Sequence, residues 1–294
     1  DTSMGCAGEP AALADAVVAE RAAFLASRAE AVAPGMAVYV VGTEVPVPGG
    51  AQEALDHLVP TTAQAARSTA TITREIFSRT LSEEVWSRVL ALVVQPGVEF
   101  GVENTIFYER RKARDLVETL RELPGMIFEA HSTDYQTVGN LRSLVEDGFS
   151  VLKVGPALTF ALREALFSLD SLASVLRPER TSLVGVLSDI MRANSSFWKG
   201  HYNPDRAETL CLYSYSDRIR YYWTHPNVQR AVNSLLGDLE ETGLPDPLIS
   251  QFLPKLYERV RTGEIPREGK ALVLAAVEDV LDDYSAACAP SKQA

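Results

Sequence analysis

Short, almost entirely apolar runs recur along the first half of the chain, and each is followed by a stretch with helical periodicity. The apolar runs cover residues 37–41, 89–94, 125–131 and 149–155, and the helical stretches cover residues 10–33, 61–88, 109–123, 137–147 and 157–176. Half-exposed strands alternate polar and apolar residues, whereas continuous apolar strands are covered on both faces. The pattern therefore predicts an α/β fold built on a parallel sheet.

Repeated strand and helix units with right-handed crossovers leave two architectures open. The sheet is either open and doubly wound or closed into a (β/α) barrel. After residue 176 the strands stop, and only helical segments follow, among them residues 229–241, 246–263 and 270–284. We therefore expect two domains, one containing the sheet over residues 1–176 and a helical extension over residues 177–294.

Composition and charge exclude several classes of partner. The chain of 294 residues carries 28 Lys and Arg against 39 Asp and Glu, a formal net charge of -11, so its field repels nucleic acid and anionic membranes. Its apolar runs fall far short of the ~20 residues that a spanning helix needs. Three widely spaced cysteines without a C-x-x-C pair are typical of reduced thiols, which favours a cytoplasmic protein.

Chemically capable side chains follow the predicted strands directly. In both architectures ligands bind beyond the carboxyl ends of the strands, so these side chains should share one rim. The rim would hold Thr43, Glu44, Gln95, Glu99, Glu129, His131, Asp134, Lys153 and Gly155, and Asp1, because "DTSMGCAGEP" precedes a helix as those loops do. Carboxylates, an imidazole, an amide and an amine on one rim suit metal-assisted or acid/base chemistry on a polar small molecule.

Four of these residues each allow two interpretations. His131 is either a hydrogen-bonded structural residue or a metal ligand. Glu44 has either a structural role, as a helix cap or an ion-pair partner of Lys153, or a functional role as a ligand or base. Lys153 lies in an apolar run, where burial would suit a Schiff-base nucleophile or a buried ion pair. Gly155 opens a helix, which suits a phosphate cradle or an ordinary turn.

Motifs with a fixed spacing give little support to other enzyme classes. The string "GEIPREGKA" is not a Walker A loop, because five residues separate Gly263 from Gly269 and Ala271 replaces the required Ser or Thr. G-x-S-x-G, H-E-x-x-H and G-x-G-x-x-G are absent. In "LYSYSDRIRYYW", Arg218 and Arg220 either clamp a phosphate or carboxylate, form part of an aromatic anchor for a partner, or pair with acids on a packed helix.

Six strings together are specific to one family. The chain carries, in this order, "DTSMGCAGEP", "GTEVPVPGG", "VVQPGVEF", "EAHSTDYQT", "LKVGPALTFALREA" and "SDRIRYYW". Over nearly its whole length it resembles the tagatose-bisphosphate aldolase Z-subunit family, the non-catalytic class II component of galactitol and N-acetylgalactosamine pathways. The resemblance implies a (β/α)8 barrel of the TIM type with a helical C-terminal extension. It also implies that Asp1 ends the fourth strand, so that the first three βα units are missing.

The resemblance implies two functions. In the first, the protein is an accessory subunit of a separate zinc-dependent aldolase, which splits D-tagatose 1,6-bisphosphate into glycerone phosphate and glyceraldehyde 3-phosphate. In the second, it is a metal-dependent C4-epimerase of ketohexoses such as fructose and tagatose, or of their 6-phosphates. The expected partners are therefore the aldolase catalytic subunit and a sugar phosphate, and open strand edges would favour a homo-oligomer.

For the epimerase we hypothesise a role for each candidate residue. A divalent metal ion would be held by Asp1, Glu44 and His131, and catalytic groups would be Glu129, Asp134 and Lys153. The substrate and its phosphate would be bound by Gln95, Ser132, Gly155, Arg218 and Arg220. The Asp-His pair that relatives carry in "GGDHLGP" is absent from this chain, so further ligands would be missing.

Overall fold

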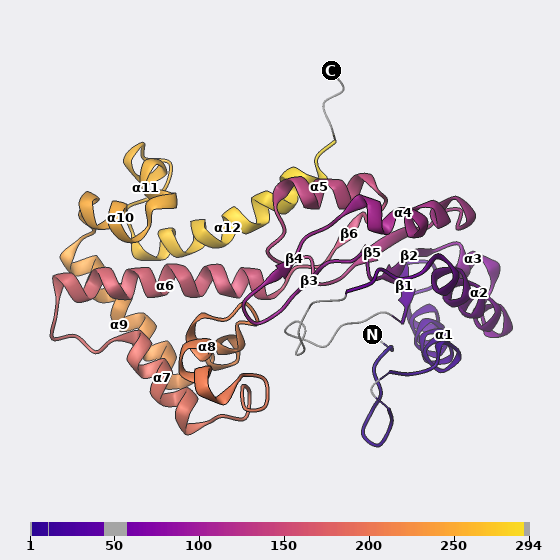
Figure 1. Ribbon diagram of the computed structural model, residues 1–294, viewed down its shortest axis with the longest axis horizontal. Coiled ribbons are helices and arrows are strands. Elements are labelled where there is room, and N and C mark those ends of the chain that lie inside the picture. Colours follow the sequence, from indigo (N-terminus) through magenta and orange to yellow (C-terminus); the bar gives the residue numbers. More distant parts are fainter. Residues whose placement is uncertain (1, 11, 44–57, 291–294) are drawn as a thin grey trace. The chain divides into compact units, whose positions relative to one another are not determined.

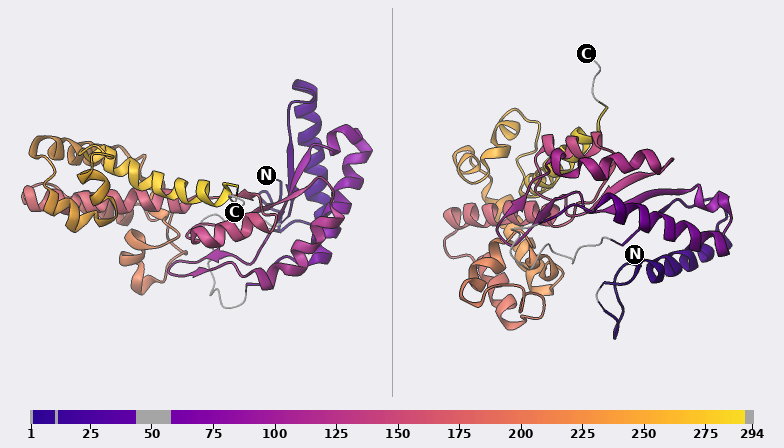
Figure 2. Two further views of the ribbon diagram at one scale, coloured as in Figure 1. Left: turned by 90° about the horizontal axis from the view of Figure 1, so that it is seen from above. Right: turned by 45° about the vertical axis from the view of Figure 1, so that its right-hand side comes forward.

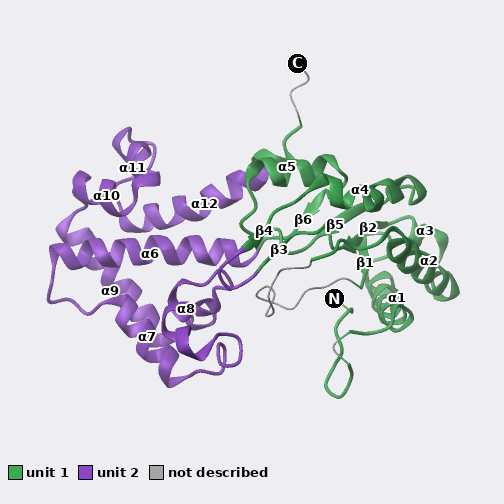
Figure 3. Cartoon of the chain, in the orientation of Figure 1, with its two compact units in different colours: residues 1–100, 105–154, 286–294 green, residues 101–104, 155–285 purple. Residues whose placement is uncertain are grey.

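The computed structural model describes residues 2–10, 12–43 and 58–290. The chain divides into two compact units, which Figure 3 colours separately. The first comprises Asp1–Phe100, Thr105–Val154 and Ala286–Ala294, and the second comprises Gly101–Asn104 and Gly155–Ser285. The chain is an α/β protein, mostly helical, with a parallel sheet (Figure 1).

The first unit contains the parallel sheet that the apolar runs predict. Its strands are β1 (Tyr39–Gly42), β2 (Val89–Val94), β5 (Ile127–Ala130) and β6 (Val151–Leu152), in the spatial order β1-β2-β5-β6. The pairing register places Gly42 opposite Val93, Val93 opposite Glu129, and Glu129 opposite Val151. Side chains of paired residues point to the same face of a sheet, so these four positions share one face.

The helices of the first unit are α1 (Asp15–Val32), α2 (Ala63–Thr80), α3 (Glu83–Trp86), α4 (Arg110–Glu118) and α5 (Val138–Glu146). Hydroxyl side chains cap three of them, because Thr62, Ser82 and Thr137 each accept a hydrogen bond from the backbone N–H three residues later. Two predicted boundaries are wrong. The first helix begins at Asp15 rather than Pro10, and the helix predicted over 61–88 is interrupted at Ser82, where a new cap forms.

A short antiparallel pair lies between β2 and α4 and is absent from the sequence prediction. It consists of β3 (Glu99–Phe100) and β4 (Thr105–Ile106), with Glu99 paired to Ile106. Phe128 of β5 and Phe149, which lies just before β6, are fully buried with their ring centroids 5.3 Å apart. Burying aromatic rings of this size supplies much of the hydrophobic stabilisation of a small core.

The second unit is built from helices (Figure 1 and Figure 2). These are α6 (Pro156–Leu176), α7 (Leu183–Ala193), α8 (Ala207–Tyr213), α9 (Pro226–Thr242), α10 (Asp246–Phe252), α11 (Pro254–Arg261) and α12 (Gly269–Cys288), with 3-10 turns η2 (Pro204–Arg206) and η3 (Arg218–Tyr222). The helix predicted over 246–263 is broken at Leu253, because Pro254 cannot continue it. In the described part of the chain, no helix combines the length and the apolarity needed to cross a bilayer.

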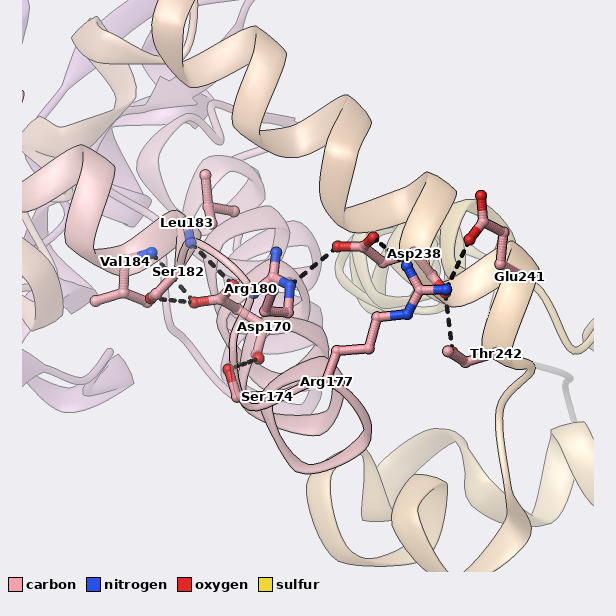
Figure 4. A network of polar contacts seen from close by, with 10 residues as sticks. All are labelled: Asp170, Ser174, Arg177, Arg180, Ser182, Leu183, Val184, Asp238, Glu241 and Thr242. Atoms are coloured by element: carbon pink, nitrogen blue, oxygen red, sulfur yellow. Dashed lines mark hydrogen bonds and ion pairs between the residues drawn. The ribbon is translucent and has the colours of Figure 1, made fainter.

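A buried carboxylate organises the start of α7, as Figure 4 shows. Asp170 of α6 accepts hydrogen bonds from the backbone N–H groups of Leu183 (2.9 Å) and Val184 (3.2 Å) and from the Ser182 hydroxyl (2.7 Å). It also forms an ion pair with the buried Arg180. One aspartate therefore satisfies the orphan donors at the first turn of α7 and fixes that helix against α6.

The same network reaches α9. Arg180 also pairs with Asp238 (3.2 Å), and Arg177 pairs with Asp238 (2.9 Å) and Glu241 (2.6 Å). Three helices that would otherwise share only apolar contacts are therefore joined by charge-assisted hydrogen bonds. Burial raises the pKa of Asp170, but the hydrogen bonds from Leu183, Ser182 and Arg180 outweigh it, so the pKa lies below its ordinary value.

We expect Asp170→Ala to lower the free energy of unfolding by about 3–5 kcal/mol, because it leaves Arg180 and two backbone donors buried without their partner. Because the folded-state pKa of Asp170 is depressed, its contribution is present above the unfolded-state pKa and is lost as the pH falls through the folded-state value. Urea unfolding at neutral and acidic pH measures both effects. Asp189→Ala, at an exposed position on α7, is the matched control and should change stability by less than about 0.5 kcal/mol. Equal losses in the two variants would contradict this role for Asp170.

Candidate functional site

A cavity of about 450 Å³ opens within the first unit, at the carboxyl ends of the parallel strands. Its polar corner is formed by Glu129, His131 and Lys153. The remaining wall is mainly apolar and consists of Thr2, Ala22, Leu25, Ala26, Ala29, Tyr39, Val40, Val41, Gly42, Phe77 and Val93. Such a mainly apolar pocket with a few convergent polar groups has the usual composition of a ligand site.

One oxygen of Glu129 holds the polar corner together. Glu129 Oε1 lies 2.7 Å from His131 Nε2 and 2.9 Å from Lys153 Nζ. The strand register explains this meeting, since Val151 lies opposite Glu129 and Lys153 is two residues further along, on the same face. The Glu129 side chain is only 5% exposed, so these two donors replace the water that it loses.

Burial raises the pKa of Glu129, but the hydrogen bonds from His131 and Lys153 outweigh it, and the pKa lies below its ordinary value of 4.5. Glu129 is therefore ionised at neutral pH, which makes His131 Nε2 the donor in their contact. The sequence predicts a buried Lys153, and that prediction is wrong, because the Lys153 side chain is 55% exposed. Burial thus gives no support for a Schiff-base role, and the catalytic role of Lys153 stays a prediction.

An ion pair between α1 and the residue before β2 stabilises the wall of the cavity. Glu30 of α1 binds Arg88 (2.7 Å) and accepts a hydrogen bond from the Tyr39 hydroxyl. The hydrogen bonds from Arg88 and Tyr39 lower the pKa of Glu30 to about 2. Arg88 also donates to the carbonyl of Ala37 (2.6 Å), just before β1. The C-terminal end of α1 is thereby tied to the strand that forms the opposite side of the cavity.

Polar side chains in the loop after β5 form hydrogen bonds with neighbouring segments of the first unit. The Thr133 hydroxyl donates to the carbonyl of Lys153 (2.5 Å), and Gln136 accepts from Tyr108 N–H (3.0 Å) and donates to the Ile106 carbonyl (2.9 Å). Ser132 has a left-handed backbone, with φ 54°. Strained backbone of this kind persists only where the surroundings impose it. These bonds hold the loop against β4 and β6 and fix His131 at the cavity.

A second buried carboxyl group lies behind this loop. Glu99 is 5% exposed, accepts from the Phe100 N–H (2.9 Å) and is hydrogen-bonded to the Ser132 side chain. Burial raises the pKa of Glu99, and the charge of the buried Asp134 adds to the rise. Ser132 and Asp134 are thus brought together with Glu99, while neither lines the cavity in the part of the chain that the structure describes. Their substrate-binding and catalytic roles stay predictions.

Among the other candidate residues, Gln95 of the first unit does not line the cavity. The side-chain oxygen Oε1 of Gln95 accepts from the N–H groups of Gly97 (2.8 Å) and Val98 (3.0 Å), so this side chain stabilises its own turn. The second unit contains the other expected phosphate-binding residues, Gly155, Arg218 and Arg220, with Gly155 at the N-cap of α6. Two expected metal ligands, Asp1 and Glu44, lie outside the described residues.

The described residues alone do not supply a metal site. Across residues 2–10, 12–43 and 58–290, no group of three or more His, Cys, Asp and Glu side chains could hold a metal ion. His131 Nε2 is hydrogen-bonded to Glu129 Oε1, so this ring nitrogen is engaged in a contact between side chains. The divalent metal therefore stays a prediction from the sequence, and we derive no chemical step through it.

Two features of the site were missed by the sequence reasoning. The apolar wall from α1 carries small residues at positions 22, 26 and 29, and their spacing of four and three could have been recognised as one helix face. Gly42 is the other feature. A Cβ atom at Gly42 would lie 2.8 Å from Val93 Cβ and 2.9 Å from the backbone N and O of Val93, and φ is +146°. Only glycine fits this close approach of β1 to β2.

The chain is an α/β protein with a parallel sheet, and its first unit holds a candidate ligand cavity. The model of one family, described as "D-tagatose-1,6-bisphosphate aldolase subunit GatZ/KbaZ-like", matches residues 1–289. The chain belongs to this GatZ/KbaZ-like family, which confirms the resemblance found in the sequence.

Two solved structures are similar to the chain. The crystal structure of a probable tagatose 6-phosphate kinase from Sinorhizobium meliloti 1021 has a TM-score of 0.88 and 49% sequence identity, and the match covers 98% of this chain and 72% of that one. The fructuronate-tagaturonate epimerase UxaE from Cohnella laeviribosi has a TM-score of 0.43 and 13% identity over 93% of this chain and 51% of that one. The second likeness is too low to carry an argument.

We expect Gly42→Ala to lower the free energy of unfolding by about 1–3 kcal/mol, because the added methyl group overlaps Val93 and the backbone is left-handed. Gly237→Ala is the matched control. Gly237 lies inside α9 with open space at the Cβ position, so this change should raise stability by about 0.5–1 kcal/mol. Urea unfolding of both variants is the measurement, and a neutral Gly42→Ala would show that β1 and β2 are not packed as described.

Proposed function

We propose that this protein is an accessory, non-catalytic subunit of a class II D-tagatose-1,6-bisphosphate aldolase in galactitol or N-acetylgalactosamine catabolism. The observation that carries the proposal is the family match over residues 1–289. A separate catalytic subunit would cleave the sugar bisphosphate, and this chain would support its folding and activity.

The strand order supports a barrel rather than a doubly wound sheet. A doubly wound sheet reverses its strand order at a switch point, whereas β1-β2-β5-β6 follows the chain without reversal. With right-handed crossovers, an unreversed order places all connecting helices on one face of the sheet. The face that carries Glu129 would then point to the interior of a (β/α)8 barrel of the TIM type, where barrel enzymes bind their ligands.

A second function is favoured by the polar corner of the cavity. An accessory subunit needs a surface, and nothing in that role requires an ionised, buried Glu129 beside His131 and Lys153. Such a carboxylate can accept a proton from a bound sugar while its two cationic or hydrogen-bonding neighbours hold it in place. We therefore keep a C4-epimerase of ketohexoses or their 6-phosphates as the alternative, with a divalent metal held as the sequence predicts.

A kinase activity, which the name of the Sinorhizobium meliloti protein would suggest, has no local support here. A P-loop joins a strand to a helix, whereas the segment from Gly263 to Gly269 joins α11 to α12. This context agrees with the failed spacing of the motif.

One pair of variants distinguishes the two functions. Glu129→Gln should leave the stimulation of a co-expressed class II catalytic subunit intact, because support of a partner needs the folded chain and not this carboxylate. If the chain is an epimerase, the same variant should slow the interconversion of fructose 6-phosphate and tagatose 6-phosphate, followed by NMR, by a factor of about 100 to 10,000. Glu122→Gln, at an exposed ion pair with Arg67 in the same unit, is the matched control.

Two results would contradict these proposals. Cleavage of D-tagatose 1,6-bisphosphate that is the same with and without this chain would overturn the accessory-subunit proposal. The absence of any interconversion after reloading with divalent cations would remove the epimerase alternative.

A further inference from the structure

Two arginines in the second unit are held by neutral hydrogen-bond acceptors and not by ion pairs, among the residues that the structure describes. Arg218 and Arg220 are both partly buried and lie on η3. Among the described residues, no ion pair joins either guanidinium group to an acid, whereas the more deeply buried Arg163 and Arg180 pair with Asp217 and Asp170. In a protein of net charge -11, two partly buried cations close in sequence without an ion-pair partner are unusual.

The nearest acid in sequence, Asp217, forms its hydrogen bonds with α6, and its charge acts on Arg220 only at longer range. Asp217 is 1% exposed, and its carboxylate binds Arg163 Nε (3.0 Å) and the Thr159 hydroxyl (2.6 Å) of α6. Its backbone is left-handed, with φ 44° and ψ 45°, which reverses the chain just before η3. This conformation is uncommon for a residue other than glycine. The carboxylate therefore neutralises Arg163 and is directed into the core.

Neutral acceptors hold both guanidinium groups in place. Arg218 donates through Nε to the Phe197 carbonyl and through Nη2 to His201 Nε2 (2.7 Å). Because arginine cannot accept a hydrogen bond, His201 Nε2 carries no proton in this contact. Burial and the charge of Arg218 both lower the pKa of His201, which agrees with a neutral ring. Arg218 is thereby positioned, and its charge stays uncompensated.

Arg220 is held in the same way. Its Nη1 donates to the backbone carbonyls of Ser216 and Asp217, and its Nη2 donates to the Tyr221 hydroxyl (2.9 Å). The ring of Tyr221 lies beside both cations, 4.5 Å from Arg220 Cζ and 5.7 Å from Arg218 Cζ, and it stacks on Phe197 at 5.3 Å. Side chains fixed before a ligand arrives lose little entropy when it binds.

We propose that Arg218 and Arg220 form a binding site for a phosphate group, either free phosphate or the phosphoryl group of a sugar phosphate. The bonds above do not use Arg218 Nη1 or Arg220 Nε, and guanidinium N–H groups are suited to the oxygens of a phosphate. The site lies within the second unit, and its existence does not depend on the aldolase or epimerase role, because it concerns binding and not turnover.

The test is a calorimetric titration of the whole chain with inorganic phosphate and with tagatose 6-phosphate, each at constant ionic strength adjusted with sodium chloride. We expect Arg220→Gln to weaken phosphate binding by at least about 10-fold, the effect of losing one charge-assisted contact. Arg230→Gln, which removes one positive charge from α9 in the same unit, is the matched control and should bind as the unaltered chain does.

Arg220→Lys keeps the charge and loses the planar guanidinium group, so its affinity for phosphate should lie between those of the unaltered chain and Arg220→Gln. Circular dichroism tests whether each variant is folded. Equal binding of both probes would assign the site to free phosphate, and tighter binding of tagatose 6-phosphate would assign it to a sugar phosphate. No binding of either probe by the unaltered chain, or equal affinities in folded Arg220→Gln and Arg230→Gln, would overturn the proposal.

Discussion

The candidate site depends on one buried carboxylate and on the two groups that share its oxygen. Glu129 lies on the face of β5 that lines the cavity, and burial there would favour its uncharged form if no neighbouring group compensated the charge. His131 and Lys153 supply that compensation, and they come from the ends of two adjacent parallel strands. The register between β5 and β6 is therefore a condition for the chemistry, because a shift by one residue would turn Glu129 into the apolar core.

The cluster of polar residues after Phe128 is explained by the same requirement. Thr133 and Gln136 are buried with hydrogen bonds to backbone groups, and Ser132 is bonded to the buried Glu99. They replace the backbone partners that a strand loses where it ends, and they hold His131 beside Glu129. Several chemically capable side chains in one short loop are thus used mainly to position one of them.

The sequence reveals those parts of the fold that follow from local periodicity. The apolar run at residues 89–94 coincides with β2, and the helical periodicity after residue 156 coincides with α6. The interruption at Ser82 and the β3–β4 pair were missed, because a cap and a two-residue ladder leave almost no periodic signal. The exposure of Lys153 was also missed, since it depends on which neighbours cover the end of β6.

The candidate site could be predicted only as a set of residues near one rim. The meeting of Glu129, His131 and Lys153 requires the strand register, which no single-sequence pattern specifies. The placement of Asp217, whose carboxylate forms its ion pair with Arg163 and not with Arg218 or Arg220, depends on a contact across 54 residues of sequence. Both arrangements arise from long-range packing, which the spacing of residues along the sequence does not predict.

The most direct test of this account is a carboxyl NMR titration of the chain with ¹³C-labelled glutamate, with Glu129 and Glu99 assigned by substitution. We expect the pKa of Glu129 to lie below its ordinary value of 4.5, because His131 and Lys153 stabilise the charged form. We expect the pKa of the buried Glu99 to lie above that value. A Glu129 that titrates above Glu99 would show that its charge is not compensated at the cavity, and the assignment of the polar corner would be wrong.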